Sequence, residues 1–246
     1  MPLLNSNDSV QRVGRVTLRA SDSQWAYAQR HSGEIESHWQ EAKAVTPTFF
    51  NGIIYLLEHI EMGEGHFSGR LIKTDFKSYL FWRDRGFSPD AGVVDGFGSA
   101  LIRSAEGHII LGRQRPGNVN SGLAYLPGGF IDGRDVDEHG FVDVAQSVAR
   151  EVKEETGLGV AELDPQPGFL VTRTGAHVSF AVEYRSHLTS DDLAARISVH
   201  IASDPDPELS AVVVIRNAED CAGVAMPPYA EVLLAHLLPP AREMKC

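Results

Sequence analysis

Three glutamates near residue 150 have the spacing of metal ligands on a helix. The segment 143–156 has the pattern of a helix, and Glu151, Glu154 and Glu155 lie within it. Residues three and four positions apart share one face of a helix, so the three carboxylates are predicted to lie on one strip of surface. Carboxylate oxygens are ligands that Mg²⁺ prefers. The sequence therefore predicts either a metal site or a solvated acidic face.

Electrostatics favours the metal site over the solvated face. The three glutamates lie in the last turns of the predicted helix, where the helix dipole already places partial negative charge. Each unfavourable acid there costs on the order of 0.3–1 kcal/mol, and the carboxylates also repel one another. Lys153 offsets only part of this charge. A divalent cation that takes oxygen ligands and bridges to phosphate would make the cluster favourable.

The same segment resembles the signature of a known enzyme family. Residues 150–158 read REVKEETGL, and the glycine loop at 126–130 reads LPGGF, with Gly129 at its fourth position. Together they are similar to the Nudix box, G-x5-E-x7-R-E-U-x-E-E-x-G-U, in which U is an aliphatic residue. The second half of the box matches at every fixed position, with Val152 and Leu158 as the aliphatic residues.

The first half of the box departs from the pattern. Counting on from the glycine places Asp135 where the family has glutamate, and seven extra residues then precede Arg150. The acidic stretch 133–140, GRDVDEHG, is thus an insertion between the glycine loop and the helix. Asp135, Asp137 and Glu138 either supply a further ligand or form a solvated loop. We expect the loop.

The Nudix resemblance implies a fold, a cofactor and a set of site residues. It implies an α/β/α sandwich with a mixed sheet, and hydrolysis of a nucleoside diphosphate derivative. It implies that Glu151, Glu154 and Glu155, helped by the backbone carbonyl of Gly128, bind Mg²⁺, with Mn²⁺ as a substitute. Arg150 would orient a catalytic carboxylate rather than touch the substrate. The catalytic residues implied are therefore Arg150 and the three glutamates.

Residues outside the box are candidates for contact with the substrate. Arg113 and Arg115 alternate at a strand end and either clamp a diphosphate or face solvent. The segments around Asn51 and Asp75 are similar to the region that precedes the box in Nudix hydrolases that cleave UDP-glucose. Both side chains can hydrogen-bond a uracil edge or sugar hydroxyls, or can cap a turn and a helix. Glu208, in a later acidic loop, is a candidate general base, although an exposed loop acid is the expected role.

Composition disfavours several other classes of function. The 246 residues include 22 Lys and Arg against 33 Asp and Glu, and the net charge of −11 disfavours nucleic-acid binding. Hydrophobic residues make up 43%, yet no stretch approaches the roughly 20 apolar residues that span a bilayer. Two cysteines are too few for a disulfide framework. We therefore expect a cytoplasmic protein that binds neither nucleic acid nor membrane.

The pattern of strands and helices predicts a mixed α/β fold in two parts. A turn-rich stretch separates an N-terminal α+β portion, residues 1–90, from a Nudix hydrolase domain, residues 91–246. The N-terminal portion contains a predicted helix at 32–45 and a hairpin with strands at 51–62 and 66–74. We expect this portion to form a wall of the substrate pocket or the surface of a homodimer.

These features together predict an enzyme with a small-molecule partner. We expect a Mg²⁺-dependent hydrolase that cleaves a UDP-sugar to a nucleoside monophosphate and a sugar phosphate. The alternative within the class is an ADP-ribose or dinucleotide pyrophosphatase. The alternative from another class is a nucleotide-sugar sensing module that kept the fold and lost hydrolysis. The complete set of Arg150 and three glutamates favours the enzyme, whereas the missing upstream glutamate leaves the sensor open.

Overall fold

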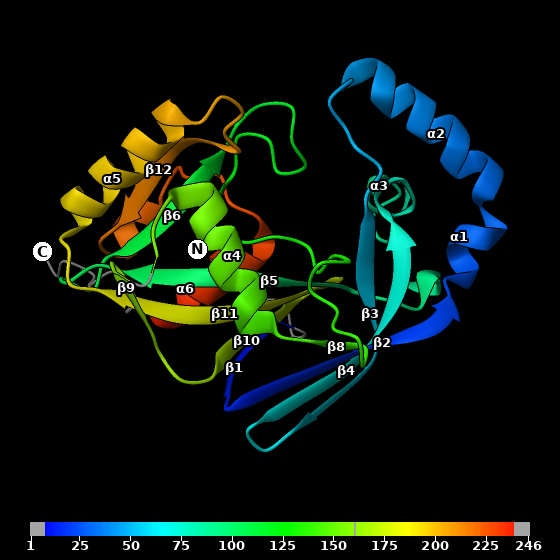
Figure 1. The fold of residues 1–246 in the computed structure, drawn as a ribbon, viewed down its shortest axis with the longest axis horizontal. Coiled ribbons are helices and arrows are strands. Elements are labelled where there is room, and N and C mark those ends of the chain that lie inside the picture. Colours follow the sequence, from blue (N-terminus) through cyan, green and yellow to red (C-terminus); the bar gives the residue numbers. More distant parts are fainter. Residues whose placement is uncertain (1–7, 160, 239–246) are drawn as a thin grey trace, which may run out of the picture.

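Two mixed β-sheets with helices packed against both make up the molecule (Figure 1). The computed structural model describes residues 8–159 and 161–238, and Cys246 lies outside them. The predicted mixed α/β class is confirmed. Among the described residues, no helix is long and apolar enough to cross a membrane.

The larger sheet contains most of the second half of the chain. Its strands β11 (His177–Ser186) and β5 (Asp95–Arg103) run parallel, and its other neighbouring strands pair antiparallel. Two short strands, β7 (Ala124–Tyr125) and β9 (Leu163–Pro165), extend it by pairing with β6 (Ile109–Gln114) and β11. The order is β1 (Ser9–Val13), β10 (Phe169–Thr174), β11, β5, β6 and β12 (Leu209–Ile215), with β7 and β9 beside this path.

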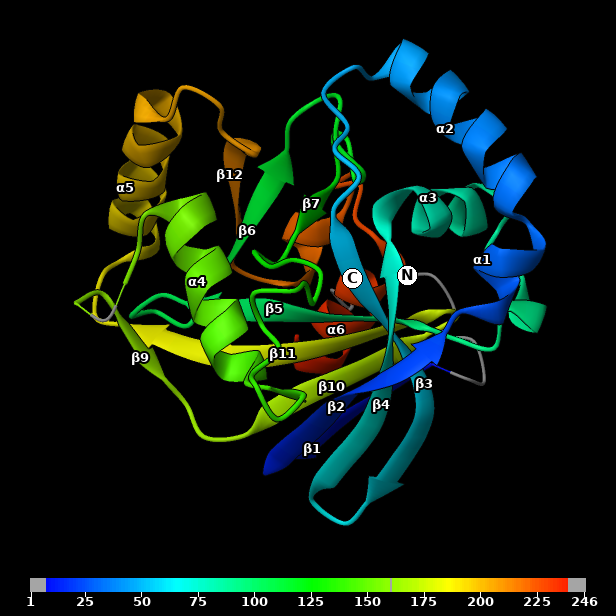
Figure 2. The same cartoon turned by 45° about the vertical axis from the view of Figure 1, so that its right-hand side comes forward.

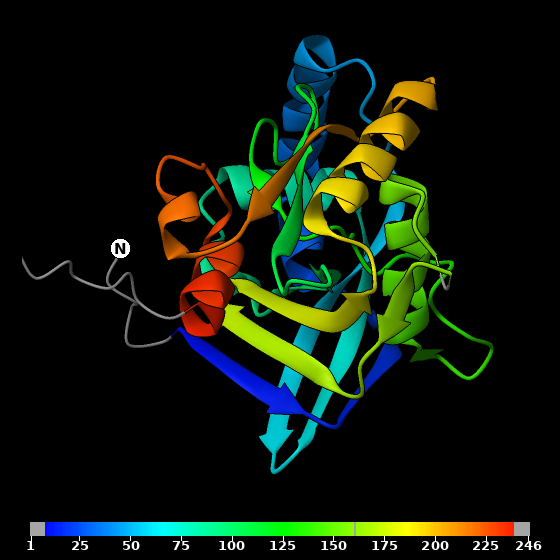
Figure 3. The same ribbon diagram turned by 90° about the vertical axis from the view of Figure 1, so that its left-hand side faces the viewer.

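Helices cover both faces of this sheet, as expected for an α/β/α sandwich. Alternate residues of a strand point to opposite faces. Phe180 and Val182 of β11 therefore share a core cluster with α4 (Val144–Thr156) and α5 (Ser190–Ser203). Ala181 between them packs in the cluster that contains α6 (Pro228–Leu237). Figure 3 shows α6 on the other side of the sheet from α4.

The smaller sheet is also covered on both faces, which explains its apolar strand at residues 53–57. Ile54 and Leu56 pack with the three N-terminal helices, whereas Tyr55 and Leu57 face the core of the larger sheet. Figure 2 shows these helices on the outer side of the smaller sheet. The elements are β3 (Ile53–Gly63), β4 (His66–Asp75), β2 (Arg15–Gln24) and β8 (Phe141–Val142), with α1 (Ala26–Arg30), α2 (Ser32–Val45) and α3 (Phe76–Asp84).

Contacts between the two sheets cross the boundary expected at residue 90. Strand β1 comes from the N-terminal portion but pairs with β10 of the larger sheet. Strand β8 comes from the predicted Nudix domain but pairs with β2 of the smaller one. The rings of Phe67 and Phe180 meet edge to face with centroids 4.9 Å apart. The two portions thus share one core, and a division at residue 90 stays a prediction.

Most predicted elements are present with shifts of a few residues at their ends. The helix at 32–45 and the hairpin of β3 and β4 are both confirmed. Residues 9–24 form two strands that the sequence pattern does not indicate. Most of these residues are exposed or half-buried and polar, so the alternation that marks a strand is weak there.

Candidate active site

Helix α4 carries the three glutamates and is fixed at both ends by its own residues. The carboxylate of Asp143 accepts a hydrogen bond from the backbone N–H of Gln146, which caps the first turn. Gly157 ends the helix with φ of 72°, a left-handed conformation that glycine adopts without steric cost. Val148 and Val152 are buried against the larger sheet. The helix is therefore anchored with its acidic strip toward the glycine loop.

Glu155 is the most deeply buried of the three carboxylates. Its side chain accepts a 3.0 Å hydrogen bond from the hydroxyl of Tyr125, while its Oε2 atom has no partner among the described residues. Burial raises the pKa of Glu155 well above its ordinary value, and the charge of Glu208 raises it further. A buried carboxylate oxygen without a partner is costly unless a ligand satisfies it.

Glu151 lies against the glycine loop, whereas Glu154 is more exposed. A Cβ atom at Gly129 would come within 2.8 Å of Glu151 Oε2, so any larger residue there would displace the Glu151 carboxylate. Burial raises the pKa of Glu151 to about 7, although the guanidinium of Arg150 acts in the opposite direction. Half of the Glu154 side chain is exposed, and the guanidinium of Arg134 approaches it to 3.6 Å.

Glu208 joins this group from the loop before β12. It lines the same cavity as Glu151 and is open to solvent there. The protein around it still raises its pKa by desolvation, and the charge of Glu154 raises it further. Glu208 is thus an exposed loop acid, as expected, but it also lines the cavity, and its role as a general base stays a prediction. Four carboxylates from α4 and this loop act electrostatically on one another.

Asp135 is buried, contrary to the expectation of a solvated loop. One oxygen of its carboxylate accepts a 2.7 Å hydrogen bond from Arg150, and its side chain is 3% exposed. The inserted residues turn back on themselves, because Val136 pairs with Val142 as an isolated bridge. The insertion thus returns the chain to α4 with Asp135 still beside Arg150. Only Asp137 and Glu138 lie in an exposed loop, as expected.

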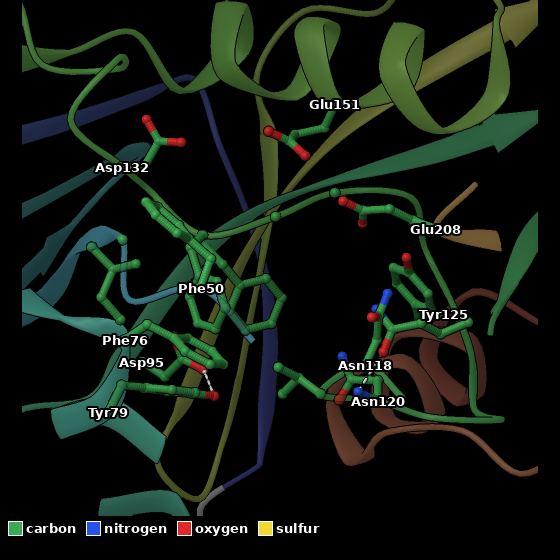
Figure 4. A pocket seen from close by; sticks show the side chains of 18 of the residues that line it. Phe50, Phe76, Tyr79, Asp95, Asn118, Asn120, Tyr125, Asp132, Glu151 and Glu208 are labelled. Carbon is green, nitrogen blue, oxygen red and sulfur yellow. Dashed lines mark hydrogen bonds between the residues drawn. The ribbon is translucent and has the colours of Figure 1, made fainter. Parts of the chain in front are cut away.

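A cavity of about 970 Å³ opens beside these carboxylates (Figure 4). Its walls come from the glycine loop, α4, the segment after β6, and the N-terminal portion. Arg134 and Arg115 both line it. Arg134 is paired with Asp132 at 2.7 Å, and Arg115 with Asp206 at 2.6 Å. The cavity thus combines two guanidinium groups with a wall that carries Glu151 and Glu208, here called the acidic wall.

The four predicted substrate residues do not come together. Arg115 and Asn51 line the cavity, whereas Arg113 donates to the carbonyl oxygen of Gly122 and lies outside it. Asp75 caps α3 by accepting from the backbone N–H of Ser78. Asn51 donates to Asp75. The alternative role of Asn51 and Asp75, capping a turn and a helix, is the one that the structure displays.

A polar group that was not predicted from the sequence lies at another wall of the cavity. The hydroxyl of Tyr79, on α3, donates a 2.9 Å hydrogen bond to Asp95 at the start of β5. Asp95 is 3% exposed, and burial raises its pKa to about 7. The available signal was a carboxylate at the start of a strand that is otherwise apolar and small, since Asp95 precedes residues 96–102, GFGSALI.

The acidic wall supplies oxygen ligands suited to a cation, but these ligands are not arranged as a complete metal site. Among residues 8–159 and 161–238, no three His, Cys, Asp or Glu side chains are arranged closely enough to hold a metal ion. The Oε2 atom of Glu155 has no hydrogen-bond partner among the described residues, so this oxygen is free to bind a ligand. Gly128 lies beside Glu155 with φ of 155°, where a Cβ atom would come within 2.2 Å of the carbonyl oxygen of Gly98. These oxygen donors fit a hard divalent cation.

Comparison with known proteins finds partial structural similarity only. No protein-family model and no curated protein matches the sequence. Similar solved structures include the Nudix hydrolase RenU from M. smegmatis, with a TM-score of 0.39 and 16% identity over 58% of this chain and 83% of that one. The MutT protein from Methanosarcina mazei Go1 has a TM-score of 0.39 and 20% identity over 58% and 91% of the two chains.

A third similar structure belongs to a longer protein. It is the bifunctional NMN adenylyltransferase/ADP ribose pyrophosphatase from Francisella tularensis, with a TM-score of 0.39 and 19% identity over 65% of this chain and 44% of that one. All three TM-scores lie below 0.5, so any function for this chain has to be argued from its own residues.

Proposed function

We propose that this chain is a Nudix-type hydrolase that uses a divalent cation to cleave the diphosphate of a nucleoside diphosphate derivative. One observation carries the proposal. Glu155 holds a buried carboxylate oxygen without a partner, beside Glu151 and Glu208, whose pKa values are also raised. Such a group gains most from a cation, and a diphosphate is the substrate that a cation would bring to an acidic wall.

Mg²⁺, or Mn²⁺ in its place, is the proposed cofactor. Glu151, Glu154 and Glu155 would bind it, together with the backbone carbonyl of Gly128. A bound cation would supply charge neutralisation on the phosphates and a lower pKa for an attacking water. The side-chain oxygens of the three glutamates supply the hard ligands that it needs.

The remaining charged residues have separate tasks in this proposal. Arg134 and Arg115 line the cavity and would bind phosphate oxygens. Glu208, with its raised pKa, would take the proton of the attacking water. Arg150 donates to both Asp135 and Glu151, so it would hold Glu151 in place rather than touch the substrate.

A nucleotide-sugar is the proposed substrate, with a UDP-sugar as the expectation from sequence. The cavity volume suits a nucleoside diphosphate derivative, and the N-terminal portion lines part of it, which supports its expected role as a pocket wall. Asn51 donates to Asp75, and Asp75 accepts from the first turn of α3. These hydrogen bonds weaken the argument that the two side chains bind uracil. Cytoplasmic location and a homodimer stay predictions from the sequence.

The test is hydrolysis of a panel of nucleoside diphosphate derivatives with Mg²⁺, with the products identified by mass. We expect a nucleoside monophosphate and a phosphorylated second product, no turnover in EDTA, and recovery with Mg²⁺ or Mn²⁺. Glu155→Gln should reduce kcat/KM by on the order of 100-fold, because it removes a charged ligand. Glu138→Gln is the matched control, since Glu138 lies in the exposed loop of the insertion.

Two results would contradict the proposal. Turnover undiminished by EDTA would exclude the metal, and normal turnover by Glu155→Gln would exclude the role of that residue. Tight binding of a nucleotide-sugar without turnover under any metal would instead support the sensing module.

A further inference from the structure

Asp95 has one carboxylate oxygen that nothing in the described protein satisfies. Its Oδ2 atom accepts the hydrogen bond from Tyr79, but its Oδ1 atom is buried without a hydrogen-bond partner among the described residues. Asp95 nevertheless lines the large cavity, so its carboxylate lies beside the space that a ligand would fill. Such an oxygen accepts a hydrogen bond and would be left unpaired by a ligand without a donor.

Among residues 8–159 and 161–238, no lysine or arginine forms an ion pair with Asp95. The Nε2 atom of His177 lies 3.9 Å from Oδ2. Burial lowers the pKa of His177, so its ring is neutral at pH 7 and cannot act as a counter-ion. Only burial and the bond from Tyr79 shift the pKa of Asp95. When Asp95 is ionised, an N–H or O–H donor on a ligand would satisfy Oδ1.

Aromatic rings surround Asp95 on its side of the cavity, and this side is here called the Asp95 wall. Tyr79 and Phe130 meet at 4.8 Å between ring centroids, and Phe97 and Tyr229 meet at 4.7 Å. All four residues line the cavity. A planar heterocycle is the ligand group that gains most from such rings, because its faces stack while its edge carries the hydrogen-bonding groups.

The Asp95 wall and the acidic wall belong to one continuous cavity. Figure 4 shows Asp95 and Tyr79 well away from Glu151 and Glu208, on the other side of the space. Tyr229 also lines this cavity, and the charges of both Glu155 and Asp95 raise its pKa. A ligand whose phosphates reach the acidic wall can thus place a ring at Asp95.

We propose that the Asp95 wall binds the nucleobase of the substrate, and that Asp95 Oδ1 accepts a hydrogen bond from an amino group of that base. This inference rests on the proposed diphosphate hydrolysis, because that reaction places the phosphates at the other wall. It selects adenine, guanine or cytosine, which carry an exocyclic amino group, over uracil, which does not. It therefore favours an amino-bearing nucleoside diphosphate derivative over a UDP-sugar.

The test compares nucleotides that differ in the amino group. Binding is measured by calorimetry in EDTA, without hydrolysis, for AMP against purine riboside monophosphate, for GMP against IMP and for CMP against UMP. We expect at least one amino-bearing nucleotide to bind tenfold or more tightly than its partner, a difference of about 1.4 kcal/mol. Sites built around a substrate hydrogen bond reject analogues that lack it.

Asp95→Asn provides the second arm of the test. Its amide can still accept from Tyr79, but then presents N–H donors in place of Oδ1, so the preference for the amino group should fall to twofold or less. Asp206→Asn removes the same charge from another part of the cavity and should keep the preference. Near-equal binding by the wild type within both purine pairs and of CMP against UMP would overturn the inference, and so would an unchanged preference in Asp95→Asn.

The outcomes separate the two proposals. Absence of an amino preference in the wild type, with metal-dependent hydrolysis intact, would overturn only the inference about Asp95. A clear amino preference without hydrolysis under any metal would overturn the proposed reaction and leave the base site standing.

Discussion

At the residue scale, the most unusual group is a buried carboxylate far from the proposed catalytic glutamates. Asp95 has a pKa of about 7 in the folded protein against an ordinary value of 3.8, because burial disfavours its charged form. Between these two pH values the folded state holds a proton that the unfolded state has released. Stability therefore falls as the pH rises from about 4 to about 7.

Asp95→Asn should remove this pH dependence. One pKa unit corresponds to 1.36 kcal/mol, so the stability of the variant relative to the wild type should rise by on the order of 3 kcal/mol between pH 5 and pH 8. Urea unfolding at the two pH values measures this difference. The control is Asp164→Asn, which changes an exposed carboxylate on β9. A difference that stays constant between pH 5 and pH 8 would show that Asp95 ionises normally.

At the element scale, helix α3 depends on two side chains that also looked like substrate contacts. Asp75 accepts from the backbone N–H of Ser78 at 3.1 Å, and Asn51 accepts from that of Lys77 at 2.8 Å. Asn51 also donates to Asp75. These bonds satisfy N–H groups that the first turn of a helix leaves unpaired. Helix α3 in turn supplies Tyr79 to the cavity.

Asp75→Ala should therefore reduce stability without altering substrate recognition. Loss of an N-cap side chain costs about 1 kcal/mol, with a usual range of 0.5–2 kcal/mol. Asp75→Asn should restore most of this, since Asn caps a helix as well as Asp does. Urea unfolding gives the stability, and kcat/KM on the best substrate should stay within about twofold in both variants. A large loss of kcat/KM in Asp75→Asn at normal stability would restore Asp75 as a substrate contact.

The sequence predicts elements well where the chain carries a periodic or capping signal. Helix α4 follows from Asp143, its valines and Gly157, and its acidic strip follows from spacing alone. The partner of Arg150 was harder to predict, because Asp135 lies fifteen positions away across an insertion. The cavity residues Asp95 and Tyr79 were missed for a similar reason. Their contact joins two segments that only the packing of α3 on the sheets brings together.

At the scale of the whole molecule, the cavity exists because the two sheets are packed together. Its wall contains residues of the N-terminal portion, such as Phe76 and Tyr79, and residues of α4 and the glycine loop. The sheets share a core in which Leu57, Leu71 and Phe67 pack with residues of β5 and β11. A shared core of this kind couples the stability of both portions.

We therefore predict that the two portions unfold together. All three tryptophans, Trp25, Trp39 and Trp82, lie in the N-terminal portion, so tryptophan fluorescence reports on that portion alone. Far-UV circular dichroism reports on the helices and strands of the whole chain. In urea, both signals should change with the same midpoint and the same slope, because strands β1 and β8 each pair with the sheet of the other portion. A fluorescence transition well separated from the circular dichroism transition would show instead that residues 1–90 fold as an independent domain, and the cavity would then lie between two separable units.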